Sequence, residues 1–321
     1  MQTTATPAAQ ISATIATLDR PDALARCLDA LLSGRVLPAE VVIVDQSQND
    51  ATQSVVEMRR SEKVPIVYIR QARRGLSVSR NTALAQVSCS IVAVTDDDCL
   101  PDPGWISAIA QTFGSEPALD ALTGRVLPLG PETPDTYAVA VRESLSRQDF
   151  VGKTLPWIIG GGNNFAVKRD WFERVGGCDE HLGVGSPGKA AEDVDLFYRL
   201  LREGAKIRYE PDVLVYHERT SKARRLATRW SYGFGIGAFC SLWLRRRDLY
   251  ALRLLVRWLR WQCRDFTVAT VRREWPEAYQ RWLSLKGTVG GLTYGLRLDS
   301  VEHRPRRNTT ADDSGTLRSL P

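Results

Sequence analysis

The chain has 321 residues, and its apolar content of 43% is enough to bury a sizeable core without disulfides. Its six cysteines (27, 89, 99, 178, 240 and 263) show neither C-x-x-C pairing nor a metal-type spacing. The first ten residues, MQTTATPAAQ, lack the features of a secretory signal, and no stretch reaches the roughly 18 apolar residues that span a bilayer. These features argue against a disulfide-dense secreted domain and a membrane-spanning protein, and they predict a cytoplasmic protein with reduced thiols.

The net charge of +6 is unevenly distributed. Between Arg219 and Arg273 there are 14 Lys and Arg and two acids, which gives +12 there and leaves −6 for the rest of the chain. A basic segment of this kind favours an anionic partner, either a membrane surface or a nucleic acid. No helix-turn-helix, zinc or RNP-type pattern accompanies the charge, so we expect no nucleic acid partner.

Strand and helix signals alternate over the first hundred residues. Apolar, β-branched runs predict strands at 11–17, 41–44, 64–69 and 91–95, and helices are predicted from Pro21 to Gly34, at 50–60 and at 76–86. Such alternation implies a parallel sheet covered on both faces. Ligands bind beyond the carboxyl ends of strands in such sheets, and Asp45 and Asp96 stand at two of these ends.

The pattern is less regular in the rest of the chain. We predict a helix at 105–113, a strand at 121–126, a helix at 193–203 and a strand at 213–216, whereas the polar segment 130–155 remains unassigned. The run from Gly160 to Asn164 (GGGNN) marks a turn or a close backbone approach to a ligand. The predicted divisions are a flexible N-terminus at 1–10, an α/β domain at 11–220, a basic helical appendage at 221–300 and a disordered tail at 301–321.

Two acidic clusters are the strongest chemical signals. The triplet Asp96-Asp97-Asp98 follows a predicted strand, and the mutual repulsion of its carboxylates would be offset by a divalent cation, Mn²⁺ or Mg²⁺, that also grips a diphosphate. The alternative is a solvated acidic turn. The pair Glu192-Asp193 opens a predicted helix, where it is either a catalytic base or a capping arrangement favoured by the helix dipole.

Six segments, taken in order, resemble the family 2 glycosyltransferases over about residues 11–220. They read SATIATLDRP, VVIVDQSQND, RGLSVSRNTAL, VTDDDCLPDPGWI, GGGNNFAVKRDWFERVGGCDEHL and AAEDVDLFYRLLREGAKIRYEPDVLVYH. The resemblance implies an α/β fold of the GT-A type, a nucleotide-diphospho-sugar transferase sandwich, followed here by the helical appendage. It also implies inverting transfer of a sugar to an acceptor hydroxyl.

The same resemblance implies donor-binding residues. Asp45 would hydrogen-bond the base of the nucleotide, with Thr17 and Arg80 lining the same pocket. Asp96 would face the ribose, and Asp97 would belong to the same donor-binding set.

It further implies a metal site and a base. Asp98 would ligate the metal that bridges the diphosphate, and His217 would complete the metal site or be a hydrogen-bonded residue at a strand end. Asp193 would be the general base, with Glu192 beside it near the acceptor. The sequence departs from the family pattern at two positions: Ala16 stands where the family often has proline, and Gln46 where it often has a second aspartate. Both departures bear on which nucleotide the protein binds.

Two other functions compete with this one. A nucleotidyltransferase also uses acids and a divalent metal, but the loop ATLDRPDA lacks the glycines that such an enzyme would carry after its first strand. A catalytically silent, membrane-associated scaffold is the second, and the intact Asp98 and Asp193 argue against it. The expected partners are a nucleotide-diphospho-sugar donor and a glycan or lipid-linked acceptor.

The basic appendage has two interpretations. Four arginines recur at +4, +3 and +4, which places them on one helix face beside apolar residues and tryptophans: Arg253, Arg257, Arg260 and Arg264. This pattern is typical of a helix at an anionic membrane surface, on the inner face of the cell membrane, or of a helical subdomain with solvated arginines. The uncharged run at 230–244 would correspondingly dip into a leaflet or pack on the α/β domain.

The loop at 183–188 (GVGSPG) is either a mobile lid or a connector.

Overall fold

The computed structural model describes residues 9–60 and 63–297. The predicted flexible N-terminus, apart from residues 9 and 10, and the predicted disordered tail at 301–321 lie outside the described residues. All six cysteines are free thiols; five are buried and Cys263 is exposed.

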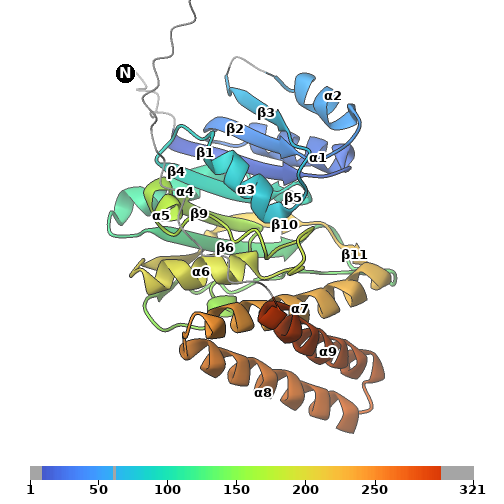
Figure 1. Cartoon of the computed structure of the whole chain (residues 1–321). Helices are drawn as coiled ribbons and strands as arrows, with labels where there is room; N and C mark the ends of the chain where they lie inside the picture. Colours follow the sequence, from blue (N-terminus) through green and yellow to red (C-terminus); the bar gives the residue numbers. More distant parts are fainter. Residues whose placement is uncertain (1–8, 61–62, 298–321) are drawn as a thin grey trace, which may run out of the picture.

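A nine-stranded sheet forms the centre of the larger domain (Figure 1). Its strands lie in the order β3-β2-β1-β4-β9-β6-β10-β5, and β8 pairs with β10. They are β1 (Ala9–Thr17), β2 (Pro38–Asp45), β3 (Ile66–Arg70), β4 (Ile91–Asp96), β5 (Cys99–Pro101), β6 (Ala121–Pro128), β8 (Gln148–Phe150), β9 (Asn164–Lys168) and β10 (Ile207–His217). A separate two-stranded sheet pairs β7 (Thr136–Tyr137) with β11 (Thr220–Ser221).

The parallel sheet predicted from the first hundred residues is confirmed there, but the rest of the sheet is mixed. β1 to β4 pair in parallel, as predicted, but β9 runs antiparallel between β4 and β6, and β5 and β8 run antiparallel to β10. The sheet is mixed because parallel strands need a long crossover, usually helical, whereas antiparallel neighbours do not. β9 follows a loop and a short 3₁₀ turn at Pro156–Ile158 instead of a helix.

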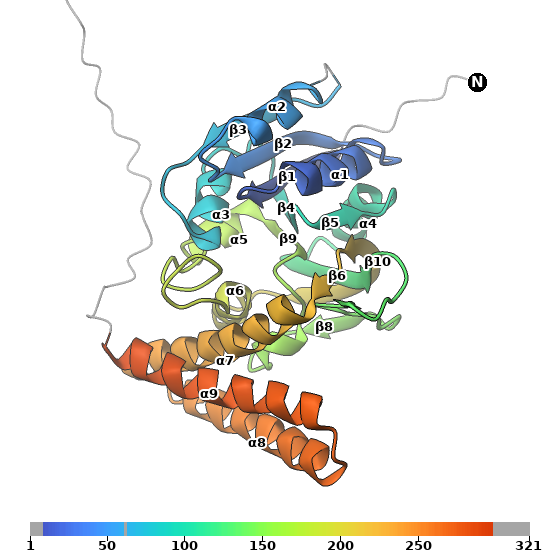
Figure 2. The same cartoon turned by 90° about the vertical axis from the view of Figure 1, so that its right-hand side faces the viewer.

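Helices cover both faces of the sheet (Figure 2). On one face, α1 (Pro21–Leu32) and α4 (Trp105–Ser115) pack on strand residues such as Ile15 and Ile43. On the other face lie α3 (Leu76–Leu84), α5 (Arg169–Arg174) and α6 (Glu192–Arg202). Because side chains alternate along a strand, Ile43 faces the first core, and Val42 and Val44 face the second. The short α2 (Ala51–Glu57) packs beside α1.

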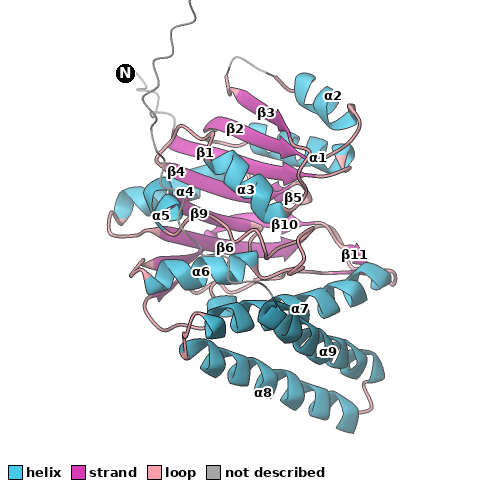
Figure 3. Ribbon diagram, in the orientation of Figure 1, coloured by secondary structure: helices cyan, strands magenta, loops and turns pink. Residues whose placement is uncertain are grey.

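The C-terminal part is a layer of three long helices below the sheet domain (Figure 3). They are α7 (Lys222–Arg245), α8 (Tyr250–Val271) and α9 (Trp275–Arg297). Ile236 and Phe239 of α7 and Leu254 of α8 share a buried cluster with Val194 and Tyr198 of α6. The helical layer is therefore packed on the helix that carries the second acidic cluster.

Glycines allow α7 and α9 to approach each other closely. A Cβ at Gly233 or Gly237 would lie 2.0 or 2.1 Å from a carbonyl oxygen of α9, and one at Gly287 or Gly291 would lie 2.2 or 1.9 Å from a carbonyl oxygen of α7. The spacing of four residues aligns these glycines on one face of each helix. The uncharged run at 230–244 is thus packed within the protein, on α9 and α6, and no helix among the described residues is long and apolar enough to cross a bilayer.

Candidate active site

The carboxyl ends of the central parallel strands bring three of the predicted residues to one edge of the sheet. Thr17 at the end of β1 pairs in register with Asp45 at the end of β2, and Ala16 pairs with Asp96 at the end of β4. Such an edge is where open α/β sheets bind ligands.

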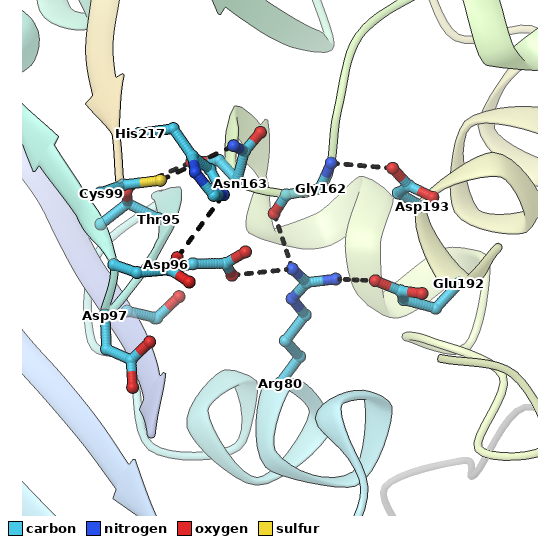
Figure 4. A network of polar contacts seen from close by, with 12 residues as sticks. Arg80, Thr95, Asp96, Asp97, Cys99, Gly162, Asn163, Glu192, Asp193 and His217 are labelled. Carbon is cyan, nitrogen blue, oxygen red and sulfur yellow. Dashed lines mark hydrogen bonds and ion pairs between the residues drawn. The ribbon is translucent and has the colours of Figure 1, made fainter. Parts of the chain in front are cut away.

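Arg80 of α3 joins the two acidic clusters (Figure 4). Its guanidinium group donates to Asp96 Oδ1 at 3.2 Å, to Glu192 Oε1 at 3.0 Å and to the carbonyl oxygen of Gly162 at 2.6 Å. Burial opposes the charge, but the carboxylates of Asp96 and Glu192 raise the pKa of Arg80. Arg80 therefore holds β4, α6 and the glycine-rich loop together as a permanent cation.

The two carboxyl groups at the start of α6 have different surroundings. Asp193 is half-buried; its Oδ2 accepts from the backbone N–H of Gly162 at 2.8 Å, and its Oδ1 accepts from its neighbour Val194 at 2.8 Å. Glu192 is buried against Arg80, and burial together with Asp193 raises its pKa to about 7. A Cβ at Gly162 would lie 3.1 Å from Arg80 Nη1 and Nη2 and from Asp193 Cβ. The backbone of the GGGNN segment thus lies close to side chains of the site, whereas its approach to a ligand stays a prediction.

Two of the predicted donor-binding residues are enclosed by the protein. The carboxylate of Asp45 is fully buried and accepts from the N–H of Ser47 at 2.8 Å and from the Tyr68 hydroxyl at 2.7 Å. Asp97 is also fully buried; it accepts from Thr17 Oγ1 at 2.7 Å and forms an ion pair with Arg20 at 2.8 Å. Burial raises the pKa of Asp97 to about 7 although Arg20 lowers it. Both side chains face inward, and Gln46 lines the cleft next to Asp45.

Asp98 and His217 lie together at the other side of the site. Nε2 of His217 is 3.6 Å from Asp98 Oδ1, and Nδ1 is 2.7 Å from the carbonyl oxygen of Glu218. Because a carbonyl can only accept, Nδ1 carries a proton, and Nε2 is the ring nitrogen that faces the Asp98 carboxylate.

This pair fits a hard divalent cation. An imidazole nitrogen whose other N–H is hydrogen-bonded to a backbone carbonyl is a common arrangement of a metal ligand, and a carboxylate oxygen is a ligand that Mn²⁺ and Mg²⁺ accept. The Cys99 thiol also lies within 4.8 Å of both groups. Burial raises the pKa of that thiol well above its ordinary value, although the hydrogen bond that Asn163 donates to the sulfur lowers it, so the group stays a thiol and is not a suitable third ligand.

A cleft of about 810 Å³ lies at this edge of the sheet. Its volume lies within the range of small-molecule sites. Asp96, Asp98 and His217 line it together with a group of cationic side chains: Arg20, Arg74, Lys189, Arg219 and Arg224. Of these, Arg20 pairs with Asp98 as well as Asp97. This cationic group was not predicted from the sequence, where the only signal for two of its members is the position of Arg219 and Arg224 shortly after His217.

The loop at 183–188 forms part of the cleft wall. Val184 and Gly185 line the cleft, and the carbonyl oxygen of Val184 accepts from the N–H of Leu76 at 2.8 Å. Gln46 holds the neighbouring turn, because its side chain both donates to and accepts from the backbone of Gly75. The loop is thus tied to the start of α3 in this structure.

Comparisons with known proteins agree with this architecture. The sequence model described as Glycosyl transferase family 2 matches residues 12–176. A pre-mycofactocin glycosyltransferase of Mycobacterium tuberculosis is 30% identical over 169 residues, which make up 51% of this chain and 34% of that protein. The chain thus spans about a third of the length of this relative. Glycosyltransferase AglE of Haloferax volcanii is 26% identical over 262 residues, 78% of this chain and 81% of that protein.

Among solved structures, a mannosyltransferase of Pyrobaculum calidifontis, in complex with GDP-Man and Mn²⁺, has a TM-score of 0.60. It is 17% identical, and the match covers 88% of this chain and 87% of that one. The likeness shows the fold, and it confirms the predicted GT-A-like α/β domain with C-terminal helices.

Proposed function

Because the chain belongs to glycosyltransferase family 2, we propose that it transfers a sugar from a nucleotide-diphospho-sugar to an acceptor hydroxyl, with inversion at the anomeric carbon. The observation that supports this most is the Arg80 network, which joins Asp96 in the wall of the cleft to Glu192, the residue before Asp193. A donor-side carboxylate and a base-bearing helix are thereby fixed relative to each other.

The cleft suits the donor diphosphate. Arg219, Arg224 and Lys189 line the cleft and supply positive charge, and Asp98 and His217 would hold Mn²⁺ or Mg²⁺ against the same phosphates. Such an ion, when bound, neutralises the charge that develops on the leaving diphosphate. Asp96 and Thr17 remain the proposed contacts to the nucleoside, and Gln46 is better placed in the cleft than the enclosed Asp45.

Asp193 is the proposed general base. Inversion needs one carboxylate to accept the proton of the acceptor hydroxyl while its oxygen attacks the anomeric carbon and the nucleoside diphosphate leaves. The N–H of Gly162 fixes one oxygen of Asp193, which orients the carboxylate. Glu192 is bound to Arg80 and serves as a positioning residue beside the base. The acceptor is a glycan or a lipid-linked saccharide in this proposal, which fits synthesis of surface glycans.

Asp193→Asn tests the base. With a glycolipid extract as acceptor, UDP-, GDP- and dTDP-sugars are screened for release of the nucleoside diphosphate by the full chain. We expect release with one class of donor and a fall of about 10²–10⁴-fold in kcat for Asp193→Asn. Donor affinity, measured by calorimetry, should stay within about threefold, since Asp193 is not a donor ligand. Full turnover by Asp193→Asn would show that another group takes the proton.

A further inference from the structure

A second cavity, of about 750 Å³, lies beside the donor cleft along α7. Val139, Thr228 and Tyr232 line both spaces, so the two meet at this helix. We call it the arginine cavity, because four guanidinium groups line it together with no acidic residue: Arg142, Arg225, Arg229 and Arg257.

These four arginines have no carboxylate partner among the described residues. Arg225 and Arg229 both donate to the same amide oxygen, Gln280 Oε1, at 2.9 and 3.3 Å. Arg142 donates only to backbone carbonyls, including that of Gly160 at 3.3 Å. By contrast, two buried arginines elsewhere in the protein are paired with acids, Arg199 with Asp195 and Arg208 with Asp149.

Positive charge without a nearby negative charge is unfavourable in the arginine cavity, where the side chains are partly removed from water. Desolvation lowers the pKa of Arg142, and desolvation together with the charge of Arg225 lowers the pKa of Arg229. Cations in partly buried positions normally have counter-charges. A bound anion would supply the missing charge, and guanidinium groups match phosphate oxygens in geometry.

The glycine-rich loop connects the arginine cavity to the proposed base. Desolvation lowers the pKa of Arg142, although the charge of the Asp193 carboxylate raises it. Arg142 also donates to the carbonyl oxygen of Gly160, and two residues further on the N–H of Gly162 donates to Asp193. Desolvation and the carboxylates of Asp193 and Glu192 raise the pKa of Tyr232, so its phenol stays a hydrogen-bond donor at the junction. Apolar side chains complete the wall, among them Leu155, Trp157 and Trp261.

We propose that the arginine cavity binds the phosphate group of an acceptor, and that the acceptor hydroxyl thereby reaches Asp193. The proposal rests on the glycosyl transfer proposed above and specifies its acceptor as a phosphate ester. A soluble sugar phosphate and a lipid phosphate share this chemistry, and the apolar wall gives the lipid phosphate a second contact.

Calorimetry on the full chain, without nucleotide and with EDTA, tests the site directly. The probes are citronellyl phosphate, its neutral counterpart citronellol, and glucose 1-phosphate. We expect citronellyl phosphate to bind at least tenfold more tightly than citronellol, because only the former bears the charge. The tighter of the two phosphates identifies the source, lipid or soluble, and either order supports a phosphate site.

Matched variants locate the probe. Arg229→Gln and Arg257→Gln should weaken phosphate binding about tenfold or more, as expected for loss of a charge-assisted hydrogen bond. Arg253→Gln and Arg260→Gln remove the same charge from exposed positions of α8 that do not line the cavity, and they should leave binding unchanged. Thermal unfolding of each variant reports whether it is folded.

The proposal would be overturned by no phosphate binding, by equal binding of citronellol, or by equal losses in the cavity and control variants. Loss in Arg224→Gln with retention in Arg257→Gln would also overturn it, because it would place the probe in the donor cleft. Nucleotide-sugar binding by the wild type is measured separately. Its absence, with phosphate binding retained, would contradict the glycosyl transfer and not the anion site.

Discussion

The three residues of the aspartate triplet have different roles because their side chains contact different partners. Asp96 faces Arg80, whereas Asp97 turns inward to Thr17 and Asp98 faces His217. The sequence predicted a donor and metal role for the triplet from its place after a strand. It could not predict that Asp97 is enclosed, because Arg20, which pairs with it, lies 77 positions earlier and is brought there only by the fold.

The carboxyl group of Glu192 makes the stability of the protein depend on pH. Its pKa is about 7 in the folded protein against an ordinary value of 4.5, so the folded state binds this proton more tightly than the unfolded state does. Stability therefore falls as pH rises between these two values, and the loss is complete above pH 7. We expect the free energy of unfolding of the wild type to drop by ~2 kcal/mol relative to Glu192→Gln between pH 5 and pH 8.

Urea unfolding in EDTA at a series of pH values measures this difference. Glutamine keeps an oxygen for Arg80 but cannot ionise, so the variant isolates the titration of one group. Parallel pH profiles for the two proteins would mean that the Glu192 carboxyl titrates normally in the folded state.

At the scale of elements, α6 is held from both sides. Arg80 contacts its first turn, and α7 contacts its middle, where Trp243 Nε1 donates to Asp195 Oδ1 at 2.8 Å. The Tyr198 hydroxyl donates to Asp248 Oδ2 at 2.6 Å in the connection between α7 and α8. The helical layer thereby fixes the position of the helix that carries Asp193.

The close contact of α7 and α9 gives a test with adjacent residues. A Cβ at Gly291 would lie 1.9 Å from the carbonyl oxygen of Phe234, whereas a Cβ at Gly290 would meet only the Phe234 ring, at 3.2 Å. Gly291→Ala should destabilise the protein by ~1–3 kcal/mol, because two backbones must move apart. Gly290→Ala should be nearly neutral, since the gain in helix propensity offsets a small shift of the ring.

Thermal unfolding of the two alanine variants provides the comparison. A lower Tm for Gly291→Ala alone is the expected result. Equal values of Tm would show that α7 and α9 are not held at this distance in solution.

Elements with local signals could be predicted, and those set by distant partners could not. The periodicity of Leu24, Leu28 and Leu31 is sufficient for α1, and these side chains are buried as a helix face requires. β9 has no comparable local pattern in the sequence. Its antiparallel position depends on pairing with β4, about 70 residues earlier, and with β6, about 40 residues earlier. The same reason hid the arginine cavity, since Arg142 lies far in sequence from the arginines of α7 and α8 that it joins.

At the scale of the whole molecule, the helical layer forms the end of the protein farthest from α2 and β3 (Figure 1). At the turn between α8 and α9 several large side chains are exposed, including Trp275 (62%) and Val271 (77%), next to the exposed Arg272 and Arg273. Basic and aromatic residues together favour an anionic membrane surface. We propose that this end docks on such a surface, on the inner face of the cell membrane.

Vesicle co-sedimentation of the full chain tests the docking. The protein should bind vesicles that contain anionic lipid, and Arg272→Gln with Arg273→Gln should weaken binding about tenfold, at roughly 1 kcal/mol for each charge near the surface. The control is Arg60→Gln with Lys63→Gln, near the loop between α2 and β3 at the opposite end. Equal binding of neutral vesicles, or an equal loss in the control, would contradict the proposed surface.

Binding of the donor is the most direct test of the proposed transfer, because it requires no knowledge of the acceptor. The measurement is calorimetry of UDP-, GDP- and dTDP-sugars with Mn²⁺ and with EDTA, on the wild type and on His217→Ala. We expect one class of donor to bind in Mn²⁺, and its affinity to fall at least tenfold in EDTA and in His217→Ala. Failure of every donor to bind in Mn²⁺, or equal affinity in EDTA, would contradict a metal-assisted glycosyl transfer in this cleft.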